Sequence, residues 1–72
     1  MVNNAAMAEF TYKKDGWEPI SASDYAIRYG GGEQYAKVKG GKEFKTDFKI
    51  NKTAYEVCLS GIEITKEEYD NF

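Results

Sequence analysis

Histidine is absent from the 72-residue chain, and with it the side chain that most often acts as a general base, a proton shuttle or a metal ligand. The acidic residues near the C-terminus do not follow the alternating spacing of a calcium loop, and the chain has no set of cysteines for zinc. The sequence therefore designates no catalytic residue and no metal ligand. We expect a protein that is not an enzyme and holds no metal ion.

Cysteine occurs only at position 58, so the chain cannot close an intramolecular disulfide. Small secreted domains of this size usually depend on two or more such bonds, which favours a reducing compartment. Because no histidine is present to activate its thiol, we expect Cys58 to be a half-buried structural residue rather than a nucleophile. The strand pairing described below places it beside Lys45.

Long apolar runs are also missing. No uncharged stretch approaches the length that spans a bilayer, and residues 1–8 have neither the basic nor the apolar region of an export signal. We expect a cytoplasmic protein that does not enter a membrane. With 42% hydrophobic residues in so short a chain, residues 9–72 are expected to form a single small domain, and residues 1–8 a flexible tail.

Glycine pairs divide the chain at short intervals, and apolar and polar residues alternate between them, which is typical of antiparallel hairpins. The clearest strand is predicted over residues 42–50, where Phe44 and Phe48 share one face with Thr46 and Ile50. That face is expected to point to the core. The other face carries charged residues and is expected to point to solvent.

The turns fix the expected register of the neighbouring strands. A three-residue loop at 39–41 places Ala36 opposite Phe44, and Tyr35 and Lys37 opposite Lys45 and Glu43 on the outer face. Two-residue turns at 51–52 and 60–61, the second with Gly61 at positive φ, continue the meander through 53–59 and 62–64. In this register, Lys37 and Lys45 look out to water.

Three further segments complete the expected fold. Residues 10–20 resemble a hairpin that turns at 14–16, with Pro19 limiting its second strand to an edge. Residues 21–30 fit either a strand or a short helix, and the helix is favoured by a capping pattern at Ser21 and by Gly30. A capping box at 65–68 predicts a terminal helix turn that buries Tyr69. The predicted class is α+β, a small antiparallel β-meander of four to six strands with one or two short helices.

The glycine runs at 30–32 and 40–41 invite comparison with phosphate-binding loops. A Walker A loop that ended at Gly41 and Lys42 would need glycine at position 36 and serine or threonine at position 43, where the chain has Ala36 and Glu43. We assign these glycines to tight turns, and we expect no cofactor.

Charge is unevenly distributed along the chain. The net charge is −2, but residues 37–52 hold six lysines and two acidic residues, a local charge of +4. An aromatic ring among these lysines and the tryptophan, whose orientation the alternation of side chains does not decide, complete the predicted binding surface, since surface aromatics are preferred anchors of interfaces. The candidate residues are Tyr35, Lys37, Lys39, Lys42, Lys45, Lys49 and Trp17.

Two functions fit this pattern. The first is a non-enzymatic protein-binding module, an accessory or inhibitory protein of the kind made by phages and mobile elements, which occludes a partner or pairs as a homodimer through an edge strand. The alternative is a nucleic-acid-binding domain in which Tyr35 stacks on a base and the lysines hold phosphates. The sequence identifies no partner.

Overall fold

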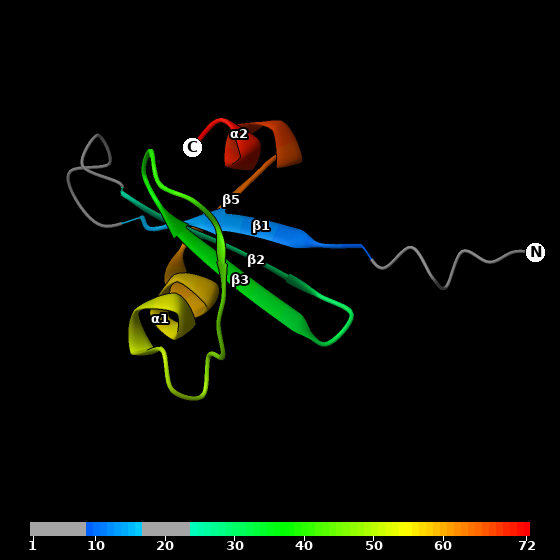
Figure 1. The fold of residues 1–72 in the computed structure, drawn as a ribbon, viewed down its shortest axis with the longest axis vertical. Helices are drawn as coiled ribbons and strands as arrows, with labels where there is room; N and C mark the ends of the chain where they lie inside the picture. The colour runs from blue at the N-terminus through cyan, green and yellow to red at the C-terminus, as the bar shows by residue number, and fades with distance from the viewer. Residues whose placement is uncertain (1–8, 17–23) are drawn as a thin grey trace, which may run out of the picture.

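The computed structural model describes residues 9–16 and 24–72. Within them, five strands form one antiparallel sheet in the order β4-β3-β2-β1-β5, and two short helices pack on it (Figure 1). The predicted α+β class is therefore confirmed. In chain order the elements are β1 (Thr11–Lys14), β2 (Tyr25–Gly30), β3 (Glu33–Val38), β4 (Phe44–Lys45), α1 (Lys52–Ser60), β5 (Ile62–Ile64) and α2 (Lys66–Asp70).

The first four strands are sequential neighbours, and the fifth is not. After β4 the chain crosses one face of the sheet as α1 and returns as β5, which pairs with β1 at the opposite edge. The chain then ends in α2, which lies on the other face, so the two helices cover opposite sides of the sheet (Figure 1). Among the described residues, the edge strands of the sheet are β4 and β5.

The helix predicted over 21–30 is wrong for residues 24–30, the part that the structure describes, because Tyr25–Gly30 forms the central strand β2. Gly31 and Gly32 form a two-residue hairpin turn with φ of 58° and 82°, a conformation that glycine adopts without steric cost. This turn pairs β2 with β3 along its whole length, and β1 pairs with its other side. Pairing on both sides outweighs a local capping signal.

The register of β3 against β4 is confirmed, with Ala36 opposite Phe44 and Tyr35 opposite Lys45. The strand expected over 42–50, however, contains only Phe44 and Lys45. Its remainder turns at Asp47, whose carbonyl accepts from the N–H of Ile50 (3.0 Å) and of Asn51 (2.8 Å). Phe48 still packs on the core, whereas Phe44 is 43% exposed and Ile50 is 82% exposed, contrary to the expected core face.

The strand expected over 53–59 is helix α1 instead, so the predicted turns at 51–52 and 60–61 are also wrong. Asn51 caps the helix, since its Oδ1 accepts from the N–H of Ala54 (3.0 Å). Gly61 ends the helix with φ of −76° and does not adopt the expected positive φ. Ala54 and Val57, three residues apart, are buried on one helix face.

The core consists of one cluster on each face of the sheet. Under α1, Ile27 of β2 and Ala36 of β3 pack with Ala54 and Val57. Under α2, Ala26 of β2 and Ile64 of β5 pack with Tyr69, whose side chain is 3% exposed. The terminal helix is confirmed, together with the capping box between Thr65 and Glu68.

Several expectations fall outside the described residues. These are the tail over 1–8, the orientation of Trp17 and the second half of the hairpin expected over 10–20. Its first strand is confirmed as β1, but the expected hairpin pairing is wrong, because β2 and β5 occupy the two sides of β1.

We predict that Asn51→Ala destabilises the fold by about 1–2 kcal/mol, because it removes the cap of α1. It also removes the bonds from Asn51 Nδ2 to the hydroxyl oxygens of Tyr25 (2.9 Å) and Thr46 (3.0 Å). Urea denaturation followed by circular dichroism measures the change. Asn71→Ala, at an exposed asparagine, is the control and is expected to cost less than about 0.5 kcal/mol. Equal losses in both variants would contradict the role given to Asn51.

Candidate functional site

The predicted lysine face is partly covered by α2. Lys37 is only 9% exposed, so the expectation that it faces water is wrong. Its Nζ donates to the carbonyls of Tyr69 (2.9 Å) and Asp70 (3.5 Å) and lies 4.9 Å from the Tyr69 ring centroid. Carbonyls at the end of a helix carry partial negative charge, which a lysine satisfies. Lys37 therefore holds α2 on the sheet and is removed from the binding surface.

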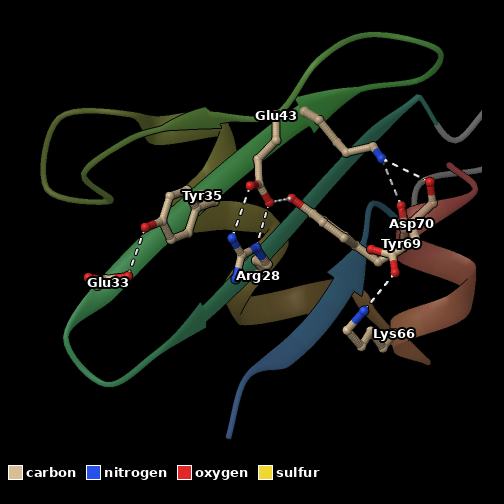
Figure 2. Close-up of polar contacts among 8 residues, drawn as sticks. Arg28, Glu33, Tyr35, Glu43, Lys66, Tyr69 and Asp70 are labelled. Carbon is tan, nitrogen blue, oxygen red and sulfur yellow. Dashed lines mark hydrogen bonds and ion pairs between the residues drawn. The ribbon is translucent and has the colours of Figure 1, made fainter. Parts of the chain in front are cut away.

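Tyr35 shares this face with Arg28 of β2. The Arg28 guanidinium lies 4.1 Å from the ring centroid of Tyr35 and 4.5 Å from that of Phe10, a double cation–π contact. The Tyr35 hydroxyl donates to Glu33 at 2.7 Å (Figure 2). One face of the ring is therefore occupied by an arginine of the same molecule.

Glu43 lies at the centre of a polar cluster that joins three elements. Arg28 donates to it through Nε (2.5 Å) and Nη2 (3.0 Å), and the Tyr69 hydroxyl donates to it at 2.7 Å (Figure 2). We call Arg28, Glu43 and Tyr69 the Glu43 network. It connects β2 and α2 to the loop that leads into β4, so it fixes the start of the edge strand.

The Glu43 network favours the ionised form of Glu43 and the neutral form of Tyr69. The hydrogen bonds from Arg28 hold the pKa of the Glu43 carboxyl below its usual range, and the bond from Tyr69 acts in the same direction. Burial raises the pKa of the Tyr69 hydroxyl, and its bond to Glu43 raises it further. At neutral pH, Glu43 is ionised and Tyr69 is a neutral donor.

A small cavity of about 240 Å³ adjoins the network. Its lining includes two ion pairs, Arg28 with Glu43 and Lys66 with Asp70 (2.8 Å). Because each charge in this lining already has a partner, the cavity offers little to a charged ligand. Tyr12 completes the lining and packs its ring against Tyr69 at 5.4 Å between centroids.

The remaining predicted lysines are exposed around β4. Among the described residues, β4 is the edge strand beside β3 and has no strand on its outer side. Three large apolar side chains lie exposed among these lysines, Phe44 at 43%, Val38 at 49% and Ile50 at 82%. We call these residues together the β4 surface: Val38, Lys39, Lys42, Phe44, Lys45, Lys49 and Ile50.

A shallow hollow of about 740 Å³ forms part of the β4 surface. The hydrogen bond from the N–H of Thr46 to the Gln34 carbonyl (2.9 Å) holds one of its walls to β3. The bond from the N–H of Phe48 to Gln34 Oε1 (2.6 Å) holds the following turn. The hollow is lined by Gly32, Gln34, Lys45, Thr46, Asp47, Lys49 and Ile50.

Cys58 and Tyr29 lie away from the β4 surface. Cys58 is on α1 against the first core cluster and not beside Lys45, because the segment that carries it is a helix. Tyr29 packs edge-on against Phe48, with 5.8 Å between ring centroids. The ion pair between Arg28 and Glu43 was not predicted from the sequence. The alternation of side chains in the predicted strands already places Glu43 on the same face as Tyr35.

Comparison of the chain with known protein families, curated protein sequences and solved structures found no match. In the part of the chain that the structure describes, neither helix has the length and apolarity needed to cross a bilayer. Within those same residues, no three acidic or cysteine side chains gather closely enough to hold a metal ion. The function must therefore be argued from the surface itself.

We predict that Glu43→Gln lowers the free energy of unfolding by about 1–2 kcal/mol at pH 7, because it removes the carboxylate charge from the three hydrogen bonds that Glu43 accepts. Since folding lowers the pKa of Glu43, its contribution is complete above the ordinary carboxyl pKa of about 4.3 and is lost as the pH falls through the folded value. The variant should therefore lose less stability than the unmutated protein on acidification. Urea denaturation at several pH values measures both effects.

Lys66→Gln is the matched control for this prediction. It breaks the exposed pair with Asp70 four residues along α2, which is worth at most about 0.5 kcal/mol. A Glu43→Gln variant as stable as Lys66→Gln, with the acid dependence of the unmutated protein, would show that the Glu43 network does not support the fold.

Proposed function

We propose that the protein is a non-enzymatic binding module that docks a partner protein on the β4 surface. The supporting observation is the exposure of Val38, Phe44 and Ile50 among lysines on an edge of the sheet. Large apolar side chains exposed along one edge of a small domain favour an interaction site there. The proposal extends to an accessory or inhibitory role, since a partner region seated on this surface is occluded from other contacts.

The backbone of β4 favours an extended partner segment. Because the N–H of Thr46 donates to the Gln34 carbonyl, the backbone groups of the preceding residue, Lys45, point away from β3. An extended segment that lies along the outer side of β4 can bond to them and add a strand to the sheet. Because β4 is short, it can form few backbone hydrogen bonds with a partner. Side-chain contacts must therefore supply much of the affinity.

The charges of the surface favour an acidic partner. Lys39, Lys42, Lys45 and Lys49 form no ion pair with any residue that the structure describes. A second copy of the chain is a poorer occupant, because pairing two β4 edges would bring two sets of lysines together. The partner we propose is a different protein with an acidic and apolar extended segment.

Nucleic acid fits this surface less well. The alternative depends on Tyr35 as a stacking platform beside Lys37, but Arg28 occupies a face of the ring and Lys37 is buried under α2. The apolar side chains of Val38 and Ile50 offer nothing to a phosphate backbone. A protein partner uses both the apolar and the cationic residues of the surface.

Affinity capture from a host lysate, with nuclease treatment, tests the proposal through matched variants. We expect the unmutated protein to retain a protein partner after nuclease digestion, and Phe44→Asp and Ile50→Asp to reduce its binding about tenfold or more. Leu59→Asp, which changes an apolar residue of α1 that is 65% exposed, should bind as the unmutated protein does. Circular dichroism checks that each variant is folded.

Two results would contradict the proposal. Captured material that disappears on nuclease digestion would favour the nucleic-acid alternative. A protein partner whose affinity falls with Leu59→Asp, and stays unchanged with Phe44→Asp and Ile50→Asp, would move the docking site to α1.

A further inference from the structure

The hollow beside β4 combines cations, an amide and an apolar wall in one place. Lys45 enters it from β4 and Lys49 from the turn that follows, and Ile50 supplies the apolar wall. We infer that this hollow binds one carboxylate side chain, an aspartate or a glutamate, of an extended partner segment that lies along β4. This inference rests on the proposed function and specifies what the partner must contain.

The charge of the lining matches a single carboxylate. Its two lysines and Asp47 leave a net charge of +1, which one bound carboxylate neutralises. Asp47 is already engaged within its own turn, where Oδ1 accepts from the N–H of Lys49 at 2.8 Å. The two ammonium groups, in contrast, pair with no acidic residue in the described parts of the chain.

Polar groups of the lining are also fixed in place. Gln34 accepts from the N–H of Phe48 through Oε1, so its amide nitrogen keeps its hydrogens for another acceptor. Thr46 Oγ1 accepts from Asn51 Nδ2 (3.0 Å), so its hydroxyl hydrogen is likewise available to an acceptor. Both residues lie in the lining with the lysines. An anionic oxygen placed there meets donors whose positions the fold already sets.

Strand geometry adds a spacing rule. Phe44 lies opposite Ala36, which belongs to the core cluster under α1, whereas Lys45 lies opposite Tyr35 on the other face. Successive side chains of an added strand also alternate between the two faces. The lining of the hollow includes Lys45 on one face and Gln34, which shares the face of Ala36, so the hollow opens at the edge between the two faces. The acidic residue that reaches it should therefore lie within two positions of an apolar residue that contacts Phe44.

Selection from a displayed library of random octapeptides on the folded protein tests this inference. We expect enrichment of peptides in which Asp or Glu lies within two positions of a large apolar residue. The variant Lys45→Glu/Lys49→Glu should bind the selected peptides at least tenfold more weakly, and selection on this variant should enrich Lys or Arg instead. The control Lys52→Glu/Lys66→Glu has the same change in net charge at exposed lysines outside the hollow, and should keep the acidic preference.

The outcomes separate the inference from the proposed function. Selected peptides that lose affinity with Phe44→Asp, but not with Lys45→Glu/Lys49→Glu, would overturn the carboxylate subsite and leave the β4 surface as the docking site. If the peptides bind the Lys52→Glu/Lys66→Glu control as weakly as Lys45→Glu/Lys49→Glu, the effect is one of net charge, and the subsite is also overturned. Failure to enrich any peptide, or selected peptides indifferent to both Phe44→Asp and the lysine changes, would overturn the subsite and remove the support for docking of an extended segment.

Discussion

The arrangement of this protein depends on the hydrogen bonds that the ionised carboxylate of Glu43 accepts. It accepts from Arg28 of β2 and from the Tyr69 hydroxyl of α2, and it belongs to the loop that leads into β4. One side chain thereby fixes the central strand, the terminal helix and the edge strand relative to each other. The rings of Phe10 and Tyr35, both in contact with the guanidinium, limit its contact with water, which strengthens the ion pair.

This arrangement leaves β4 as an edge strand with no neighbour on its outer side among the described residues. One helix packs on each face of the sheet, and two cations of the face under α2, Arg28 and Lys37, already bond to other residues of the chain. The lysines around β4 have no such partners among the described residues, and they surround exposed Phe44, Val38 and Ile50. A domain this small buries too little surface to leave large apolar groups exposed without cost, which supports a binding role for them.

Local signals in the sequence predicted part of this fold. The register that pairs Ala36 with Phe44 followed from the glycines at 40 and 41 and from the alternation of side chains over residues 35–45. The capping box at Thr65 was enough to place α2. The helix over Lys52–Ser60 was missed because Tyr55, Val57 and Leu59 alternate like a strand, while the true helical face is only Ala54, Val57 and Cys58. The cap at Asn51 was the available signal for it.

The candidate site was less predictable, because it depends on contacts between distant segments. Parity correctly put Tyr35 and Lys37 on one face, but only the crossing of α1 and the pairing of β5 with β1 bring α2 over that face. No local pattern specifies such a crossing. Exposure of Phe44 and Ile50 likewise follows from the turn at Asp47, which ends the strand that alternation predicted to be longer.

Amide hydrogen exchange in β4 tests most directly whether this edge is open for a partner. The N–H of Thr46 is bonded to Gln34, while the N–H of Lys45 points away from β3. We expect nuclear magnetic resonance to show slow exchange at Thr46 and exchange close to the unprotected rate at Lys45 in the isolated protein. Protection of Lys45 as strong as that of Thr46 would mean that the outer side of β4 is already covered, and would contradict the account of the β4 surface as a free docking edge.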